Sequence, residues 1–337
     1  MTAVRGGPLV SVVTPVQDGG HFLAECIESV LRQTYTSFEL VIFDDASRDD
    51  SLEIAQRFAR TDGRIRVERS PVRLGVMESH NAAFRLMSPE AKYCKVVSPE
   101  DGLFPECLER LVELAERNPS VAIVGSYQLV DATVRWQGFE YPRAVFPGRE
   151  ICRRIFLSTG PGFGFGTPTS VLYRADLVGS ADGFYPRALP HSDASAAFSV
   201  LRTWDYGFVY AVLSWGRIHP ELESLKSARL GWNVAAYLRD LVAYGPAFLD
   251  RAELDRAVRR HLADYYRFLA ASLRRWRDRA FWEYHERALG ELGYPFRGSR
   301  LAAAFAKTVV RRLVHPIQLV RQCWRAAAGR SVRESIA

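Results

Sequence analysis

The chain has 337 residues, of which 48% are hydrophobic and 25% charged, with a formal net charge of +7. These values describe an ordinary globular protein, large enough for one sizeable domain with an appendage or for two domains. No run of 18 apolar residues predicts a membrane span, and the N-terminus lacks the apolar core of a signal peptide. The five cysteines are scattered and lack paired metal-ligand spacing, which favours reduced thiols in a cytosolic protein.

Strand-like and helix-like patterns alternate over the first 130 residues. Apolar, β-branched runs predict strands at residues 9–16, 38–43, 65–67, 93–97 and 121–124. Helical periodicity predicts helices at about 21–33, 49–60, 76–87 and 104–117. This alternation implies right-handed crossovers and an α/β fold with a mainly parallel sheet.

The pattern changes twice in the rest of the chain. Residues 131–225 are rich in glycine and proline turns, and residues 230–292 are helical in character with breaks near Gly245-Pro246 and Gly293. We therefore expect an α/β domain over 1–228, a helical region over 229–296 and a basic amphipathic tail over 297–337.

Two pairs of carboxylates follow predicted strands. Asp44-Asp45 ends the second strand, and Ser98-Pro99-Glu100-Asp101 follows the fourth. Ligands of open α/β sheets bind at this edge, and hard cations such as Mg²⁺ or Mn²⁺ take carboxylate and phosphate oxygens. The two pairs thus predict a binding site for a divalent cation, which would in turn bind a diphosphate. The alternatives are that Asp44-Asp45 caps the next helix or lies solvated in a turn, and that Glu100 and Asp101 form the first turn of the helix near Phe104.

A nicotinamide site is not expected. It would need a G-x-G-x-x-G turn after the first strand, whereas the chain has Val-Gln-Asp-Gly-Gly-His over residues 16–21.

Three segments resemble the family 2 inverting glycosyltransferases, which have the nucleotide-sugar-binding fold called GT-A. They are Val10–Val16, Ala24–Tyr35 and Phe38–Ser51, and Leu74-Gly75 and Asn81–Ala83 match a further glycine and asparagine segment. The likeness is dense over residues 9–125 and thinner to about 225. It implies a GT-A mixed, mainly parallel sheet flanked by helices, followed here by a helical C-terminal extension.

The resemblance also implies roles for individual residues. Asp45 matches the carboxylate that hydrogen-bonds the base, commonly uracil, and Asp44 supports it. Glu100 and Asp101 occupy the aspartate motif that grips ribose and the metal–diphosphate, although Ser98 stands where the family has a first aspartate. The nucleotide should border Thr14, Pro15, Val16 and Asp18.

Asp193 falls where the family has the base that takes the acceptor's proton. Its alternative role is a helix cap, because it opens a predicted helix, and Ser195 stands where relatives often have a second acid. His219 matches a histidine that some relatives place near the diphosphate, with a structural role as the alternative. Gly166 and Thr167 lie where acceptor and donor sugar would meet a loop.

The tail carries the positive charge. No acidic residue lies between Glu291 and Glu334, while nine lysines and arginines do. Basic residues and an apolar stripe of Leu301, Phe305 and Val309 share one predicted helix, which suits an anionic membrane surface. A solvated face docked on the protein is the alternative, and no nucleic-acid-binding motif accompanies the charge.

We therefore expect an enzyme that moves a sugar from a nucleotide diphosphate-sugar, UDP-linked on this interpretation, to a hydroxyl of a glycan or lipid-linked acceptor. It would use Mg²⁺ or Mn²⁺ and work in the cytoplasm, with peripheral contact at the inner face of the membrane. The alternative is a protein of the same fold that has lost catalysis and binds nucleotide-sugar or acts as a scaffold. Ser98 and Ser195 motivate it.

Overall fold

The computed structural model describes residues 6–157, 165–179, 183–186, 192–218 and 230–314. The chain divides into two compact units. Unit 1 comprises residues 1–225 and 243–251, and unit 2 comprises residues 226–242 and 252–337. The expected boundary at residue 228 stays a prediction.

Unit 1 is built on a mixed sheet with strand order β3-β2-β1-β4-β9-β6-β10-β5. Its longest ladders are parallel (β1–β2, β2–β3 and β6–β10), while β9 runs antiparallel to both neighbours, β4 and β6. This mixed, mostly parallel sheet confirms the expected fold class. The strands are β1 Val10–Val16, β2 Phe38–Asp44, β3 Ile65–Arg69, β4 Tyr93–Val96, β5 Gly102–Leu103, β6 Val121–Val130, β7 Thr133–Arg135, β8 Val145–Phe146, β9 Val171–Arg174 and β10 Asp205–Gly216.

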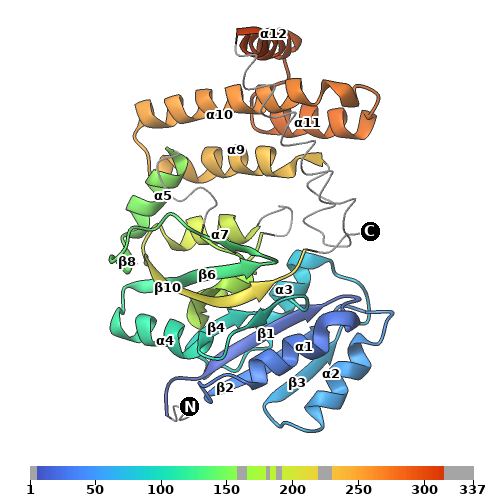
Figure 1. Ribbon diagram of the computed structural model, residues 1–337, viewed down its shortest axis with the longest axis vertical. Helices are drawn as coiled ribbons and strands as arrows, with labels where there is room; N and C mark the ends of the chain where they lie inside the picture. Colours follow the sequence, from blue (N-terminus) through green and yellow to red (C-terminus); the bar gives the residue numbers. More distant parts are fainter. Residues whose placement is uncertain (1–5, 158–164, 180–182, 187–191, 219–229, 315–337) are drawn as a thin grey trace. The chain divides into compact units, whose positions relative to one another are not determined.

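Helices cover both faces of this sheet (Figure 1). Right-handed crossovers from β1 to β2 and from β2 to β3 place α1 and α2 on one face, and the return crossover from β3 to β4 places α3 on the other. The helices are α1 Gly20–Leu31, α2 Ser51–Ala59, α3 Val76–Arg85, α4 Cys107–Arg117, α5 Gly148–Phe156, α6 Ala175–Val178 and α7 Ser192–Val200, with a 3₁₀ turn η1 at Pro168–Ser170.

The core of unit 1 lies between the sheet and helices α1 and α4. Every residue of β1 is buried, as expected for a central strand covered on both faces. Leu23 and Ile27 of α1 recur at helical spacing and are fully buried. Burial of each such side chain contributes about 1.5–3 kcal/mol, so Ile27→Ala should cost about 2–5 kcal/mol.

Four cysteines of unit 1 are free thiols in this core. Cys26, Cys94, Cys107 and Cys152 are buried, and burial raises the pKa of each thiol, that of Cys107 to about 11. Cys323 lies outside the described residues. The four described thiols are therefore protonated at neutral pH, which makes them poor nucleophiles and poor metal ligands.

Unit 2 is helical. Its helices are α9 Trp232–Tyr244, α10 Arg251–Ala271, α11 Arg279–Glu291 and α12 Gly298–Val314, with a 3₁₀ turn at Leu273–Arg275. The 3₁₀ turn at Gly245–Ala247, between α9 and α10, falls in unit 1. The breaks at Gly245-Pro246 and Gly293 fall where the sequence predicts them. A buried hydrogen bond between Tyr265 and His285 (2.7 Å) joins α10 to α11. Asp278 caps α11 by accepting from the amide of Phe281.

Helix α12 begins against α10, where the amide of Arg297 donates to the hydroxyl of Tyr266 (2.9 Å). Farther along, Phe305, Val309 and Val310 of α12 are exposed. In the part of the chain that the structure describes, no helix is both long enough and apolar enough to span a membrane.

Candidate active site

The carboxyl ends of β1, β2 and β4 meet at one edge of the sheet. Val16 pairs with Asp44 at the ends of β1 and β2, and β4 runs parallel to β1 on its other side. The segments after β1 and β4 also touch, because a Cβ built on Gly19 would lie 3.1 Å from the side chain of Pro99. The topology therefore brings both carboxylate pairs to a common edge.

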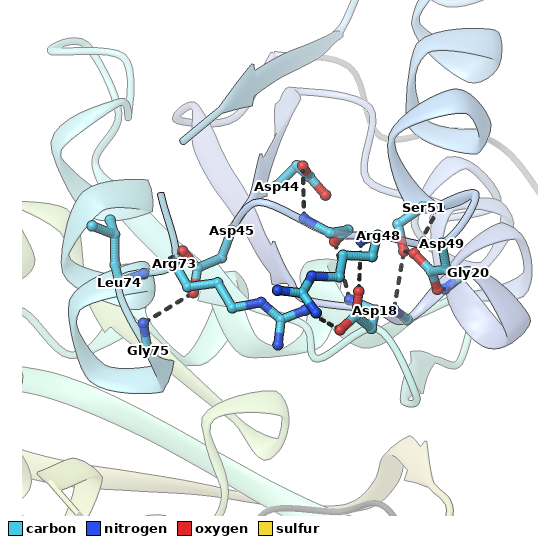
Figure 2. A network of polar contacts seen from close by, with 12 residues as sticks. Asp18, Gly20, Asp44, Asp45, Arg48, Asp49, Ser51, Arg73, Leu74 and Gly75 are labelled. Atoms are coloured by element: carbon cyan, nitrogen blue, oxygen red, sulfur yellow. Dashed lines mark hydrogen bonds and ion pairs between the residues drawn. The ribbon is translucent and has the colours of Figure 1, made fainter. Parts of the chain in front are cut away.

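Asp45 holds the start of α3. Its carboxylate is fully buried, and its two oxygens accept hydrogen bonds from the amides of Leu74 (2.7 Å) and Gly75 (3.0 Å), as Figure 2 shows. A carboxylate at a helix N-terminus is stabilised by free amides and by the helix dipole. The alternatives of a solvated turn and of a cap on the next helix are both wrong for Asp45. Its contact with a nucleobase stays a prediction.

Asp44 is also fully buried and supports the same turn. One oxygen accepts from the amide of Ser47 (3.3 Å) and pairs with Arg69 Nε (3.3 Å). The other oxygen, Oδ1, has no hydrogen-bond partner among the described residues. Asp44 thus anchors the loop between β2 and α2 and is not solvated either.

Asp18 faces outward from the loop after β1. It accepts from the amide of Arg48 (2.7 Å) and forms an ion pair with Arg73 (Figure 2). The hydrogen bond from Arg48 and the charge of Arg73 lower the pKa of this carboxyl. Asp18 therefore carries a negative charge at neutral pH and links three loops that the sequence separates.

Side chains of the β2–α2 loop and of the first residue of α2 also hold the segment that leads into α1. Ser47, Ser51 and Asp49 accept hydrogen bonds from the amides of residues 18, 19 and 20, at 3.0, 3.0 and 2.9 Å. The preceding residues Thr14, Pro15 and Val16 are buried in β1. Their contact with a nucleotide stays a prediction.

Asp101 is buried and has polar partners. The interpretation of Glu100 and Asp101 as a helix start is wrong, because β5 intervenes and α4 begins only at Cys107. Burial and the neighbouring charge of Glu100 raise the pKa of Asp101 to about 7. Hydrogen bonds with Thr169 and Gln128 act in the opposite direction, as does the charge of Lys95.

The partners of Asp101 are themselves fixed. Gln128 on β6 accepts from the hydroxyl of Thr167 (2.9 Å), which brings that predicted loop residue into contact with the group. The hydroxyl of Thr169 accepts from the amide of Ser98 (3.1 Å). We call Asp101, Gln128, Thr167 and Thr169 the Asp101 network.

A buried lysine stands behind this network. Lys95 of β4 is fully buried, and its ammonium donates to the carbonyl oxygens of Thr169 and Val96. Burial lowers its pKa to about 8, so the group is still mostly charged at pH 7. A buried cation is costly unless its charge is compensated, and the electrostatic interaction between Lys95 and Asp101 favours the charged form of both.

Glycines allow close approach at Asp101. A Cβ on Gly216 of β10 would lie 2.5 Å from Asp101 Oδ1, so a side chain there would displace the carboxylate or the strand. Gly216 also lines a cavity of about 430 Å³ together with Phe22, Leu129, Asp131, Trp215, Arg217 and Ile218. Gly166 has a φ of +114°, which favours glycine at the turn before Thr167.

A divalent cation fits the donor set at this edge. The described residues contain no cluster of three histidine, cysteine or acidic side chains that would form an all-protein cage. Mg²⁺ commonly binds through one or two carboxylates and substrate phosphates, and Glu100 and Asp101 offer two neighbouring carboxylates. Burial and then the charge of Glu100 raise the pKa of Asp101, and a cation beside these two carboxylates would favour the charged form of Asp101.

Asp193 lies in the first turn of α7 and is half-buried. Burial raises the pKa values of Tyr173 and Tyr185, and the negative charge of Asp193 adds to this effect. The role of Asp193 as a base stays a prediction, with the helix cap as its alternative. His219 lies outside the described residues.

Comparison with known proteins agrees with this architecture. The family model described as glycosyl transferase family 2 matches residues 11–180, which is just over half of the chain. The chain belongs to glycosyl transferase family 2.

Similar sequences come from several bacteria. Glycosyltransferase GlyG of Streptococcus pneumoniae is 31% identical over 36% of this chain and 40% of its own length. Glycosyltransferase EpsJ of Bacillus subtilis is 35% identical over 35% of this chain and 33% of its own length. The chain thus spans less than half the length of these two relatives.

Two solved structures show the same fold. S. aureus TarS 1–349 in complex with UDP-GlcNAc superposes with a TM-score of 0.63 at 16% identity, over 84% of this chain and 80% of TarS. Mannosyltransferase PcManGT of Pyrobaculum calidifontis, in complex with GDP-Man and Mn²⁺, has a TM-score of 0.57 at 14% identity, over 95% and 84%. The family member described here therefore has the GT-A fold.

Several residues of the site were not anticipated from the sequence. Lys95 and Gln128 each interrupt an apolar strand, which is a signal that could have been used. The roles of Arg73, Thr169 and Gly216 depend on contacts with residues that lie tens of positions away in the sequence, so no local sequence pattern predicts them.

Proposed function

We propose that the protein is an inverting glycosyltransferase that moves a sugar from a nucleotide diphosphate-sugar to a hydroxyl of a glycan or lipid-linked acceptor. The observation that carries this proposal is the meeting of Asp44-Asp45 and Glu100-Asp101 at one sheet edge. Membership of the family and relatives named as glycosyltransferases support it. A UDP-linked donor is the preferred case, since TarS was solved with UDP-GlcNAc.

The chemistry assigned to the chain is one displacement. Asp193 would take the proton from the acceptor hydroxyl while that oxygen forms a bond to the anomeric carbon from the face opposite the diphosphate. The bond from that carbon to the diphosphate oxygen breaks, and the nucleoside diphosphate leaves with the electron pair. A general base contributes about 10²–10⁴-fold to such a step.

Glu100 and Asp101 would hold the cation, with Lys95 and the Asp101 network fixing the Asp101 carboxylate. A bound Mg²⁺ or Mn²⁺ supplies Lewis-acid neutralisation of charge on the diphosphate. Asp45 and Asp18 would lie beside the nucleoside, at the ends of β2 and β1. Asp45 would recognise the base after a shift of residues 74 and 75, because its carboxylate has no exposed surface.

We also propose that the protein works in the cytoplasm and touches the inner face of the membrane through α12. Exposed Phe305 and Val309 lie on the same helix as Arg300 and Lys307, which is the composition of an interfacial basic helix.

Nucleotide titration tests the proposed function. UDP and GDP should be titrated with and without Mn²⁺, and UDP-GlcNAc, UDP-glucose and GDP-mannose screened for hydrolysis. We expect tighter binding with Mn²⁺ and measurable hydrolysis of one donor. Asp101→Asn should remove the Mn²⁺ effect, whereas the charge-matched control Asp62→Asn, at a residue paired with Arg64 (2.7 Å), should keep it.

The second candidate is a protein of this fold that binds nucleotide-sugar without turning it over. It is motivated by Ser98 and Ser195, which replace acids of the family pattern. Nucleotide binding without hydrolysis of any donor, and without a response to Mn²⁺, would favour this candidate.

A further inference from the structure

The side chain of Asn81 forms two hydrogen bonds with the backbone of a segment that is far away in the sequence. Its Nδ2 donates to the carbonyl oxygen of Tyr185 (2.8 Å), and its Oδ1 accepts from the amide of the same residue (2.9 Å). Asn81 lies in α3 and is 1% exposed, so both hydrogen bonds are shielded from water. A bidentate contact across 104 residues fixes both the position and the orientation of the peptide at Tyr185.

The surroundings of this contact reinforce it. Gly183 has a φ of +91°, and a Cβ there would lie 2.9 Å from Asn81 Nδ2, so the chain passes directly over the amide. The ring of Tyr185 packs against those of Phe84 (5.4 Å) and His80 (5.5 Å), which are also on α3. Residues 183–186 are therefore held by α3 through polar and aromatic contacts.

The same segment supports the start of α7. The hydroxyl of Ser192 donates to the carbonyl oxygen of Pro186 (2.8 Å), and Asp193 is the next residue. Burial raises the pKa of Tyr185 well above its usual value, and the charges of Tyr173 and Asp193 add to this effect. The segment held by Asn81 is thus joined by a hydrogen bond to the residue that precedes Asp193.

The other end of α3 is held by Asp45, through the amides of Leu74 and Gly75. One ten-residue helix therefore connects the carboxylate at the end of β2 with the segment that supports Asp193. Hydrogen bonds at its start and at Asn81 therefore link α3 to both of these regions.

We propose that Asn81 is a positioning residue. Its two hydrogen bonds with the backbone of Tyr185 would place the Asp193 carboxylate for removal of the acceptor's proton. This inference rests on the proposed function, in which Asp193 is the base. It assigns Asn81 no contact with substrate. A misplacement of about 1 Å at a reacting group can cost about 10²-fold in rate, so loss of these two hydrogen bonds should lower turnover without changing donor affinity.

The test is a double-mutant cycle in the full-length protein. The variants are Asn81→Ala, Asp193→Asn and the combination, and the readouts are kcat for donor hydrolysis and Kd for UDP. The donor is whichever of UDP-GlcNAc, UDP-glucose and GDP-mannose the wild type hydrolyses fastest. Asn118→Ala is the control, since it removes an amide side chain that bonds only locally, to the carbonyl oxygen of Leu114 (2.8 Å).

If Asn81 acts through Asp193, Asn81→Ala should lower kcat by about 10²-fold in the wild type and by less than about 2-fold in the Asp193→Asn background. The Kd for UDP should stay within about 2-fold. An equal loss of kcat in both backgrounds would overturn the inference, because Asn81 would then act independently of Asp193. Unchanged kcat in Asn81→Ala would overturn it as well.

Gly183→Ala provides a second variant in case Asn81→Ala does not fold. It leaves Asn81 in place and disturbs the same contact from the other side, so it should repeat the loss of kcat. Failure of the proposed function gives a different result. In that case the wild type hydrolyses no donor, or the Asp193→Asn variant has the same kcat as the wild type. Either result would overturn the proposed function and, with it, the role of Asn81.

Discussion

Asp45 uses both of its oxygens to accept amide hydrogens from the start of α3, so replacing it removes a helix contact as well as a candidate ligand contact. Two measurements are needed to separate these effects. Stability reports the helix contact, and nucleotide affinity reports the ligand contact.

We expect Asp45→Ala to lower the free energy of unfolding by about 1–3 kcal/mol and to weaken UDP binding by about 1.5–3 kcal/mol, the range for a lost charged hydrogen bond. Thermal denaturation and calorimetric titration check the two values. Asp278→Ala is the matched control, because Asp278 caps α11 in unit 2 through the amide of Phe281 (3.1 Å). It should cost stability and leave UDP affinity unchanged. Unaltered UDP affinity in a folded Asp45→Ala variant would remove Asp45 from the nucleotide site.

The raised pKa of Asp101 predicts how pH affects both stability and metal binding. The folded chain holds a proton up to a pH of about 7, whereas the unfolded chain releases it near the ordinary value of 3.8. The contribution of Asp101 to stability is therefore most favourable below pH 3.8 and declines as pH rises toward 7. A cation that replaces the proton should offset this decline above pH 7.

Proton and metal compete for Asp101. The Kd for Mn²⁺ measured with UDP present should therefore be roughly tenfold higher at pH 6 than at pH 7.5. Titrations at the two pH values check this. Asp101→Asn should show no Mn²⁺ response at either pH. A pH-independent Kd in the wild type would mean that Asp101 is not a ligand.

At the scale of single elements, a substitution at Asp193 in the first turn of α7 distinguishes a catalytic role of this residue from a helix-capping role. If Asp193 takes the acceptor's proton, Asp193→Asn should lower kcat by about 10²–10⁴-fold with an unchanged melting temperature. Asparagine caps a helix about as well as aspartate, so a cap role predicts that both quantities stay nearly the same. Retained turnover in Asp193→Asn would therefore refute the assignment of the base.

The end of β10 sets the space around Asp101. Gly216→Ala would place a methyl group 2.5 Å from Asp101 Oδ1, so either strand or carboxylate must move. We expect a loss of the Mn²⁺ effect on UDP binding and a destabilisation of about 1–3 kcal/mol, the usual range for overpacking. Gly290→Ala in α11 is the control, because a Cβ there meets nothing within 4 Å. A wild-type Mn²⁺ response in Gly216→Ala would show that this space is not critical.

The elements themselves could be predicted from the sequence because their signals are local. The apolar run of β1 and the carboxylates at the ends of β2 and β4 are visible in a short window, and they predict the parallel half of the sheet and the edge where the carboxylates meet. The family resemblance supplied the GT-A fold, which the structure confirms.

The partners of the site residues could not be predicted in this way. Asp45 bonds amides 29 and 30 residues away, although a helix begins much closer, at Ser51. The strand β5 is only two residues long and changes the setting of Asp101, because it separates that residue from α4. Such contacts depend on tertiary packing, which propensity and periodicity do not encode.

At the scale of the whole molecule, α12 is the element proposed to reach a surface outside the protein. Vesicles with anionic lipid should bind the full chain, and purely zwitterionic vesicles should bind it at least tenfold more weakly, since each basic residue near an anionic surface contributes about 1 kcal/mol. Sedimentation with vesicles of the two compositions measures this difference.

Arg300→Glu/Lys307→Glu should abolish the preference for anionic vesicles. Arg279→Glu/Arg287→Glu is the charge-matched control on α11 and should keep it, if the contact is specific to α12. Equal binding to both vesicle types would remove the membrane from the proposed function, and loss of the preference in both variants would assign it to net charge alone.

The buried thiols of unit 1 give the protein a set of internal reporters. Cys26 lies in α1, Cys94 in β4, Cys107 at the start of α4 and Cys152 in α5, and all four are shielded and protonated in the folded state. In a Cys323→Ser background, alkylation of each would require the surrounding structure to open, so its rate would measure the free energy of that local opening. Peptide mass spectrometry after timed alkylation would then rank the four regions by local stability. Slower modification of Cys94 and Cys107 with UDP and Mn²⁺ present would reveal a rigidified sheet edge without any radioactive or fluorescent substrate.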